Sequence, residues 1–403
     1  MLTPARLTQA STLRDNANGS RWLPNVQVEY SSVCPFNCDA TRLLLLHFSY
    51  FALYDGSGKY LFDCTENGRF EVNASSRPRW STRHPEIFYY LKQNQIKAYN
   101  TLSRTSILVK TFSEYQTIDD GGEADFGIDG RVRVLRGDNR EIFVFNTQTG
   151  ETGPKLATDG HSFNNLVLAL NGYQFLVSWN DYGTGPFQGI WIYDWDLKNA
   201  RNLAPVQGHM DVGRDIDGSD VLIWASSADK NPICGSAGTG IVKIPLNGAA
   251  PSCITTFPWD IAFHVSCPMK RQGEFFISTY GSVPGAIYRC SMAPVNREQL
   301  ISLQHVAADY EQEPKVSCSR DGSKIVFIEG SDVWMAALTT STPLQPPAPE
   351  PSTPITVEAK PGTLPAKPKR WTHRGRFLYQ DDEVVGLMDS PDLSAAIAEK
   401  MNS

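Results

Sequence analysis

Ionisable side chains recur at similar positions in four consecutive segments of this sequence. Each stands eight or ten residues before a polar turn, and the four are His161, His209, His264 and Glu313. If the segments are repeats of one structural unit, equivalent positions face one another and these side chains converge. Two or three histidines with a carboxylate or an amide are ligands suited to Mn, Ni or Zn. The pattern therefore predicts a divalent-metal site, with the ligands His209, His264, Gln312 and Glu313.

The predicted chemistry of such a site is removal of a proton next to a carboxylate. A divalent cation could neutralise a uronate carboxylate and acidify the adjacent proton. His161 is a candidate catalytic base, and Arg214 is a candidate partner for a substrate carboxylate. The alternative is structural, because polar side chains at strand starts can simply hydrogen-bond water and backbone. The odd spacing between Arg214 and His209 also turns Arg214 toward sheet packing.

The segments that carry these residues are copies of one unit. Each copy has a short strand, a polar turn that often contains Asp-Gly, and a run of β-forming residues, as in GHMDVGRDIDGSDVLIW and EQEPKVSCSRDGSKIVF. Seven copies can be counted. Their post-turn strands begin near Leu43, Ile87, Val132, Phe175, Val221, Phe275 and Ile325. The spacing of roughly 40–50 residues is typical of the blades of a β-propeller.

The second half of each copy supplies further strands, for example IFVFNTQTG and GIWIYDWDL. Alternating Val, Ile, Tyr, Phe and Trp are typical of half-buried strands, and Asn-Gly or Asp-Gly of tight hairpin turns. The sequence therefore predicts an all-β fold, a seven-bladed β-propeller over residues 1–338. The last copy ends near Leu338 without an outer strand. We expect part of the first 25 residues to complete that blade, because an unpaired edge invites aggregation.

A different composition follows the repeats. Residues 339–369 are rich in Pro, Thr, Ala and Glu, which predicts an extended linker. Residues 370–403 predict a small module with a hairpin, Arg376–Tyr379 and Val384–Met388, and a helix that begins at the Ser390 N-cap. A module of this size is expected to dock on a partner.

Composition excludes several classes of protein. The chain has 403 residues, a net charge of −6 and no long basic run, so phosphate-driven nucleic-acid binding is not expected. Apolar runs are too short to cross a bilayer, and MLTPARLTQASTLRDN at the N-terminus lacks the apolar core of a secretory signal. We therefore expect a soluble protein without a membrane partner, either cytoplasmic or, if it is phage-encoded, associated with a virion. The eight cysteines are scattered, which favours reduced thiols over disulfides or metal ligands.

Residues 30–335 resemble the oligogalacturonate lyase family, on the repeats GHMDVGRDIDGSDVLIW, FHVSCPMKRQGEFFIST and EQEPKVSCSRDGSKIVF. The resemblance implies a seven-bladed propeller that cleaves uronic-acid oligomers by β-elimination with a divalent metal, often manganese. His264 matches a ligand histidine of that family, and Gln312 matches the glutamine of the last blade. The sequence departs from the family at Gln312-Glu313-Pro314, where the histidines of the family are missing. The C-terminal module resembles short bacteriophage proteins.

Two functions of different classes fit these observations. In the first, the protein is a carbohydrate-active propeller that binds or cleaves an acidic oligosaccharide or polysaccharide at the mouth of its channel. In the second, it is a non-catalytic interaction or structural protein, such as a phage virion component, that uses the propeller as a platform. Its partner would then be a protein held through residues 370–403, and it would be associated with a virion.

Overall fold

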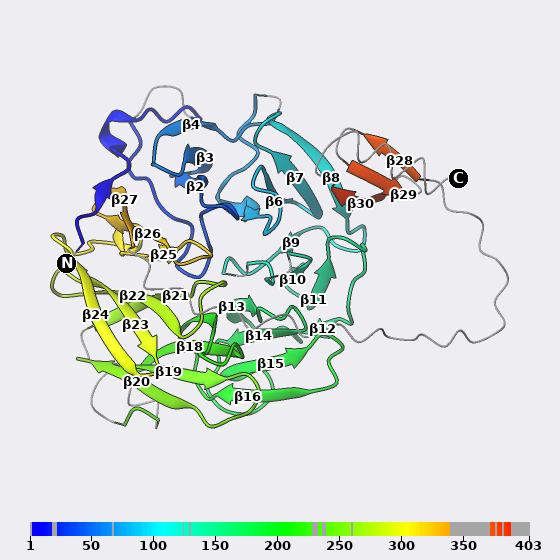
Figure 1. The fold of residues 1–403 in the computed structure, drawn as a ribbon. Helices are drawn as coiled ribbons and strands as arrows, with labels where there is room; N and C mark the ends of the chain where they lie inside the picture. The colour runs from blue at the N-terminus through cyan, green and yellow to red at the C-terminus, as the bar shows by residue number, and fades with distance from the viewer. Residues whose placement is uncertain are drawn as a thin grey trace. The chain divides into compact units, whose positions relative to one another are not determined.

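Seven antiparallel sheets surround a common axis in the computed structural model of the chain, one sheet for each sequence repeat (Figure 1). This arrangement is a seven-bladed β-propeller, as predicted. The structure describes residues 2–17, 22–66, 68–123, 125–128, 130–227, 233–235, 239–258 and 261–338, and three strands near the C-terminus.

The strands of blades one to four follow one another along the chain. Blade one contains β2 (Arg42–His47), β3 (Tyr50–Asp55) and β4 (Tyr60–Asp63). Blade two contains β5 (Arg79–Trp80), β6 (Ile87–Lys92), β7 (Gln95–Asn100) and β8 (Thr105–Thr111). Blade three contains β9 (Ile118–Asp119), β10 (Val132–Gly137), β11 (Glu141–Asn146) and β12 (Leu156–Ala157). Blade four contains β13 (Phe163–Leu168), β14 (Gln174–Trp179), β15 (Ile190–Asp194) and β16 (Ala200–Ala204).

Blades five and six have the same plan, and blade seven combines the two ends of the propeller. Blade five contains β17 (His209–Arg214), β18 (Asp220–Ser227), β19 (Thr239–Pro245) and β20 (Ser252–Phe257). Blade six contains β21 (Ile261–Ser266), β22 (Glu274–Gly281), β23 (Ala286–Met292) and β24 (Val295–Ser302). Blade seven contains β25 (Ser317–Cys318), β26 (Lys324–Glu329), β27 (Asp332–Ala337) and β1 (Ala5–Arg6). Helix in the described residues is confined to three 3-10 turns, η1 (Ala10–Thr12), η2 (Ala74–Ser76) and η3 (Tyr310–Gln312).

Blade one departs from the predicted four strands. Its innermost position is occupied by a single bridge between Phe36 and Leu43, beside the three strands β2 to β4. Pro35 precedes the bridge and has no amide hydrogen for the ladder, although its carbonyl accepts a hydrogen bond from Leu44 N at 2.9 Å. The backbone therefore follows the inner edge of the blade without forming a full strand.

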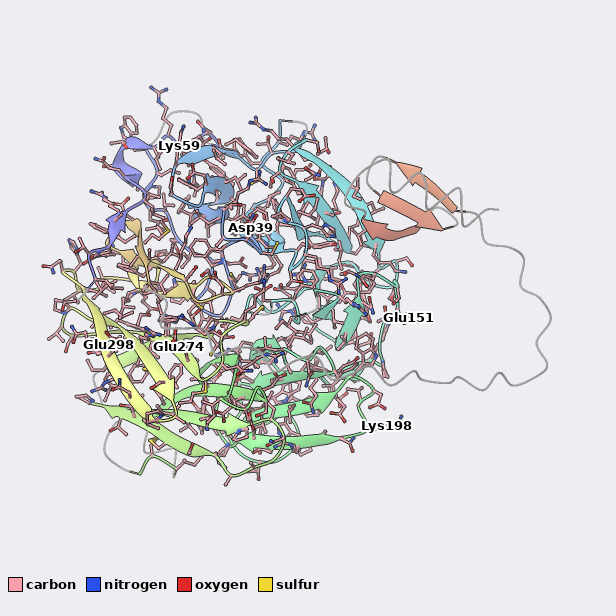
Figure 2. All side chains as sticks on the ribbon, in the orientation of Figure 1. Asp39, Lys59, Glu151, Lys198, Glu274 and Glu298 are labelled. Atoms are coloured by element: carbon pink, nitrogen blue, oxygen red, sulfur yellow. A yellow bond between two sulfur atoms is a disulfide. The ribbon has the colours of Figure 1, made fainter. Side chains whose placement is uncertain are left out.

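Apolar side chains on both faces of each blade form the core between neighbouring blades. On β18, Val221 and Ile223 pack with blade six, and the alternate residues Leu222 and Trp224 pack with blade four. Successive side chains of a strand point to opposite faces, so one strand reaches both neighbours. Each fully buried aliphatic side chain contributes about 1.5–3 kcal/mol, and Figure 2 shows side chains filling the spaces between the sheets.

The N-terminal strand closes the ring. β1 pairs with β27, with Ala5 opposite Met335 and Arg6 opposite Trp334, so the prediction that the first residues complete the last blade is confirmed. The carboxylate of Asp332 is nearly buried and is held by three donors from the N-terminal segment. They are the Arg6 guanidinium, Thr8 Oγ1 at 3.1 Å and Ala10 N at 2.7 Å. We call these four residues the Asp332 clasp.

The inner strands define two ends of the propeller. β13, β17 and β21 begin at one end, which we call the entry end, and turn into β14, β18 and β22 at the other, which we call the turn end. A six-residue strand such as β17 spans about 17 Å between its first and last residue. Side chains at the two ends therefore belong to separate surfaces.

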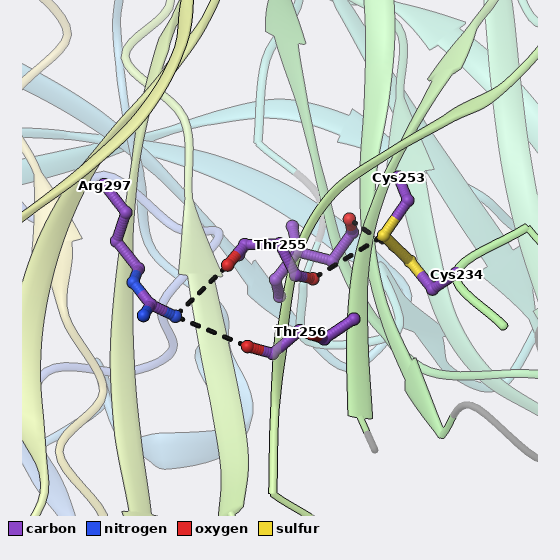
Figure 3. The surroundings of a disulfide bond; sticks show 6 residues. Cys234, Cys253, Thr255, Thr256 and Arg297 are labelled. Atoms are coloured by element: carbon purple, nitrogen blue, oxygen red, sulfur yellow. Dashed lines mark hydrogen bonds between the residues drawn. A yellow bond between two sulfur atoms is a disulfide. The ribbon is translucent and has the colours of Figure 1, made fainter. Parts of the chain in front are cut away.

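One disulfide is present, although the sequence favoured reduced thiols over disulfides. Cys234 follows β18 and Cys253 lies on the outer strand β20, and they are bonded with their Cα atoms 5.0 Å apart (Figure 3). The outer edge of blade five places these two residues side by side. The other six cysteines are free.

The C-terminal part forms a separate unit, Thr342–Ser403. Its described strands are β28 (Trp371–Arg374), β29 (Phe377–Gln380) and β30 (Glu383–Leu387), paired antiparallel in that order. The predicted hairpin falls on β29 and β30. The predicted linker over residues 339–369 and the helix from Ser390 lie outside the described residues. No helix of the described residues could span a membrane.

The clasp gives a test of ring closure. Asp332→Ala should lower the free energy of unfolding by about 2–3 kcal/mol, because it leaves buried donors without an acceptor. Urea unfolding of the full chain, followed by tryptophan fluorescence, measures the change. Glu114→Ala is the matched control, since its carboxylate faces Lys155 at 3.5 Å on the surface. Equal midpoints for the two variants would contradict the closing role of the clasp.

Candidate functional site

Two of the sequence-predicted histidines lie against each other at the entry end. His209 begins β17 and His264 lies on β21, the inner strands of neighbouring blades. Their rings are stacked with centroids 4.6 Å apart and planes 5° from parallel. Tyr280 of β22 also stacks on His264 at 5.1 Å, and the Tyr30 ring meets the His264 ring edge-on at 5.4 Å. We call His209, His264, Tyr30 and Tyr280 the aromatic stack.

Hydrogen bonds fix the orientation of both imidazoles. His264 Nε2 lies 2.9 Å from the Glu313 carboxylate, so the predicted proximity of these two residues is observed. His209 Nδ1 bonds to the carbonyl oxygen of Phe263, which can only accept. His209 is therefore the Nδ1–H tautomer, and its Nε2 carries a lone pair. The buried Nδ1 of His264 has no hydrogen-bond partner among the described residues.

Burial sets the charges in this stack. It lowers the pKa of His209, and it lowers the pKa of His264 well below its ordinary value, with further lowering by His209 and Lys315. Both imidazoles are thus neutral near pH 7. Burial also raises the pKa of Glu313, against the opposing effect of Lys315. Neutral imidazoles can act as bases, and burial shifts the Glu313 carboxyl toward its protonated form.

Lys315 is the charged group that the sequence pattern did not indicate. Its side chain is fully buried, and burial lowers the pKa of its ammonium to about 8. The ammonium donates to the carbonyl of Tyr310 at 2.7 Å and lies 3.6 Å from the centre of the Tyr310 ring. Tyr310 belongs to η3 and is 56% exposed. The segment between β24 and β25 thus brings a buried cation, Glu313 and an exposed aromatic ring to the aromatic stack.

Further buried acids lie deeper in the channel. Glu123 accepts a hydrogen bond from Asn165 of β13 and shares one with Tyr30, and burial raises its pKa to about 8. Below it, a cavity of about 20 Å³ is lined by Asp211, Arg320 and other residues. This cavity has room for one water molecule.

The geometry does not fit the predicted divalent metal held by His209, His264, Gln312 and Glu313. The lone pairs of an imidazole lie in the ring plane, so two parallel stacked rings do not converge on one ion at about 2 Å. His209 Nδ1 and His264 Nε2 are also engaged by a carbonyl and a carboxylate. The described residues contain no group of three or more His, Cys, Asp or Glu arranged to hold a metal.

Gln312 and His161 lie apart from the aromatic stack. The Gln312 side chain faces its own loop, where its Oε1 accepts from Ala308 N at 3.4 Å. His161 stacks on Phe187 with centroids 4.6 Å apart and faces Asp181 at 3.5 Å. These partners belong to the loop between β14 and β15. The inward position of blade four belongs instead to Asn165, because a bulge between Phe163 and Asn165 shifts the register that the count assumed.

Arg214 lies at the turn end, at the opposite end of β17 from His209. Its guanidinium donates to the Gly218 carbonyl at 3.4 Å, and its backbone forms a bridge with Gln272. This position is consistent with a structural role in sheet packing. A strand of this length separates it from the stack by about 17 Å, so it cannot bind the carboxylate of a ligand held there.

The fold and this site define a seven-bladed propeller with a buried, titratable cluster at one channel mouth. No protein-family model matches the sequence. No curated protein matches it either. An oligogalacturonate lyase in complex with manganese has a similar structure, with a TM-score of 0.58 and 14% identity over 84% of this chain and 94% of that one. An oligogalacturonate lyase from Vibrio parahaemolyticus has a TM-score of 0.56 and 11% identity, over 84% of this chain and 94% of that one. Hydrazine synthase of Kuenenia stuttgartiensis has a TM-score of 0.52 and 12% identity, over 81% of this chain and 99% of that one. At these identities the likeness establishes the fold.

The pKa of Lys315 can be tested through folding stability. Its folded value of about 8 lies below its ordinary value of 10.5, so the unfolded chain binds more protons between these limits. The stability of the wild type relative to Lys315→Met should therefore rise through that window, at most by about 1.4 kcal/mol per pH unit. Urea unfolding at pH 7.5, 8.5 and 9.5 measures it. Lys315→Arg is the control, since arginine keeps its charge and its difference from Lys315→Met should stay constant. If the free energy of unfolding of the wild type relative to Lys315→Met is the same at all three pH values, the pKa of Lys315 is not lowered by folding and its ammonium is solvated.

Proposed function

We propose that the entry-end mouth binds an acidic oligosaccharide, with Lys315 as the partner of a uronate carboxylate. The observation that carries this proposal is the full burial of Lys315 beside two neutral imidazoles. A buried charge is costly unless it is paired, and strongly shifted pKa values concentrate at functional sites. Tyr310, the exposed ring over the ammonium, would move aside or stack on the sugar when the ligand enters.

The same residues supply a route for β-elimination. Lys315 neutralises the uronate carboxylate, which acidifies the proton on C5. The lone pair on His209 Nε2 takes that proton, and the Phe263 carbonyl stabilises the Nδ1–H side of the resulting imidazolium. The electron pair left on carbon forms the C4–C5 double bond, and the C4–O bond breaks. Burial raises the pKa of Tyr280, so its phenol keeps a proton for the departing oxygen. The likeness in fold to oligogalacturonate lyases supports uronates as the first ligands to test.

In a second proposal, the protein has no catalytic activity. Both His264 and Lys315 are fully buried, which also suits a closed structural network. In that case the propeller is a platform for a protein partner, bound through residues 370–403, as in a virion component. Deletion of those residues would then abolish partner binding, whereas changes at His209 and His264 would leave it intact.

Binding of galacturonate oligomers by the full chain tests the first proposal. Calorimetry should show Lys315→Met weakening the affinity by about 1.5–3 kcal/mol, the usual worth of a hydrogen bond to a charged group. Affinity should fall above pH 8 as Lys315 loses its proton. His209→Gln should abolish formation of the ultraviolet-absorbing unsaturated product while binding persists.

Two control variants distinguish binding at Lys315 from a general attraction of the uronate to positive charge. Lys315→Arg keeps the positive charge and should retain most of the affinity. The exposed Lys59→Met removes an equal charge far from the stack and should change nothing. If no uronate binds to the folded wild type at millimolar concentration, the acidic-glycan proposal fails and the platform proposal takes its place.

A further inference from the structure

A second concave site lies at the turn end, between blades three and four. It is a groove of about 720 Å³, within the size range of small-ligand sites. Its lining includes Arg131, Asn146, Asn171, Tyr173, Asp194 and Trp195. These residues come from the ends of β10, β11 and β15 and from the turn between β13 and β14. The groove is therefore separate from the aromatic stack, which lies at the entry end.

Two aromatic side chains, Tyr173 and Trp195, line this groove. Tyr173 is 74% exposed at the tip of its turn, and Trp195 is partly exposed. Trp195 N donates to the Tyr173 carbonyl at 2.7 Å, which links the two turns that carry them. Trp195 also packs against the core between blades three and four. A Cβ on Gly153 of blade three would lie 2.9 Å from its indole nitrogen, so the backbone there comes close to the ring. The indole is thus held in place while one part stays accessible.

The polar groups of the groove are pre-oriented by their own hydrogen bonds. Asp194 accepts from Gln174 Nε2 at 2.9 Å and from Asn199 Nδ2 at 2.7 Å. Asn171 Oδ1 accepts from Tyr173 N at 2.8 Å, which fixes the amide beside the ring. Carboxylate and amide groups held in this way can bond pairs of hydroxyls without further ordering.

We propose that this groove binds a neutral oligosaccharide. Flat aromatic rings suit the apolar C–H face of a pyranose, and fixed amides and carboxylates suit its hydroxyls. Two aspartates, Asp194 and Asp196, and one arginine, Arg131, line the groove, and Asp196 is paired with Lys198 at 2.6 Å. The charges therefore nearly balance, which favours an uncharged sugar over a uronate. The site is independent of the function proposed for the entry end and takes a different chemical class of glycan.

Titration of the full chain with neutral cello-, malto-, manno- and galacto-oligosaccharides tests the groove. At least one should change the tryptophan fluorescence and bind measurably by calorimetry. Tyr173→Ala should weaken that binding by 10-fold or more, because it removes one stacking face. Asp194→Asn should weaken it by at least 5-fold, since it keeps the shape but exchanges an acceptor for a donor.

Matched variants distinguish binding in this groove from binding elsewhere on the propeller. Tyr182→Ala removes a ring that is 52% exposed in the loop between β14 and β15, and should leave binding unchanged. Lys315→Met should also leave it unchanged, which separates the groove from the entry-end site. The proposal is overturned if no neutral sugar binds, if Tyr173→Ala binds like the wild type, or if a galacturonate oligomer or a peptide occupies the groove instead.

Discussion

Closure of the ring is the constraint on which the rest of this structure depends. Each blade is apolar on both faces, so a blade without two neighbours would expose a core surface to water. β1 resolves this by pairing with β27, and the Asp332 carboxylate holds the N-terminal segment through three donors, of which those of Thr8 and Ala10 are buried. Closure also positions the candidate site. His209, His264 and Lys315 come from blades five and six and from the connection into blade seven, whereas Tyr30 precedes blade one and meets both histidine rings across the closed ring.

Polar residues in the channel balance the apolar packing between the blades. Arg320 of blade seven donates to the Trp80 carbonyl of blade two at 3.0 Å, and Arg79 and Arg133 both pair with the buried Asp120. Such pairs gain from low dielectric but lose hydration, so they add little net stability while fixing the relative placement of blades. At the channel mouth the arrangement differs from these ion pairs, because the Lys315 ammonium lies next to neutral imidazoles. The shifted pKa values of Lys315 and of the two imidazoles follow from that arrangement.

The fold could be predicted from the sequence because the same order of strands and turns recurs in each blade repeat. Alternating apolar residues, Asp-Gly turns and the missing outer strand together specified seven blades and the closing role of the N-terminus. The contact of His209, His264 and Glu313 also followed from counting along the repeats. The count was wrong for His161, where a bulge in β13 moves Asn165 to the inward position. The stacking of the two imidazoles is incompatible with their convergence on one metal ion. This stacking and the burial of Lys315 both depend on three-dimensional packing, which the spacing of residues does not reveal.

The two ends of the propeller differ because different connections form them. The segment between β24 and β25 at the entry end brings Tyr310, Glu313 and the buried Lys315 to the two imidazoles. The turn end is built from hairpin turns, which present side chains such as Tyr173 and Trp195 to solvent. Buried groups respond to proton concentration and to a ligand charge, whereas exposed rings and fixed amides respond to the shape of an uncharged ligand. The two sites that we propose therefore call for different ligand chemistries at opposite ends of one closed scaffold.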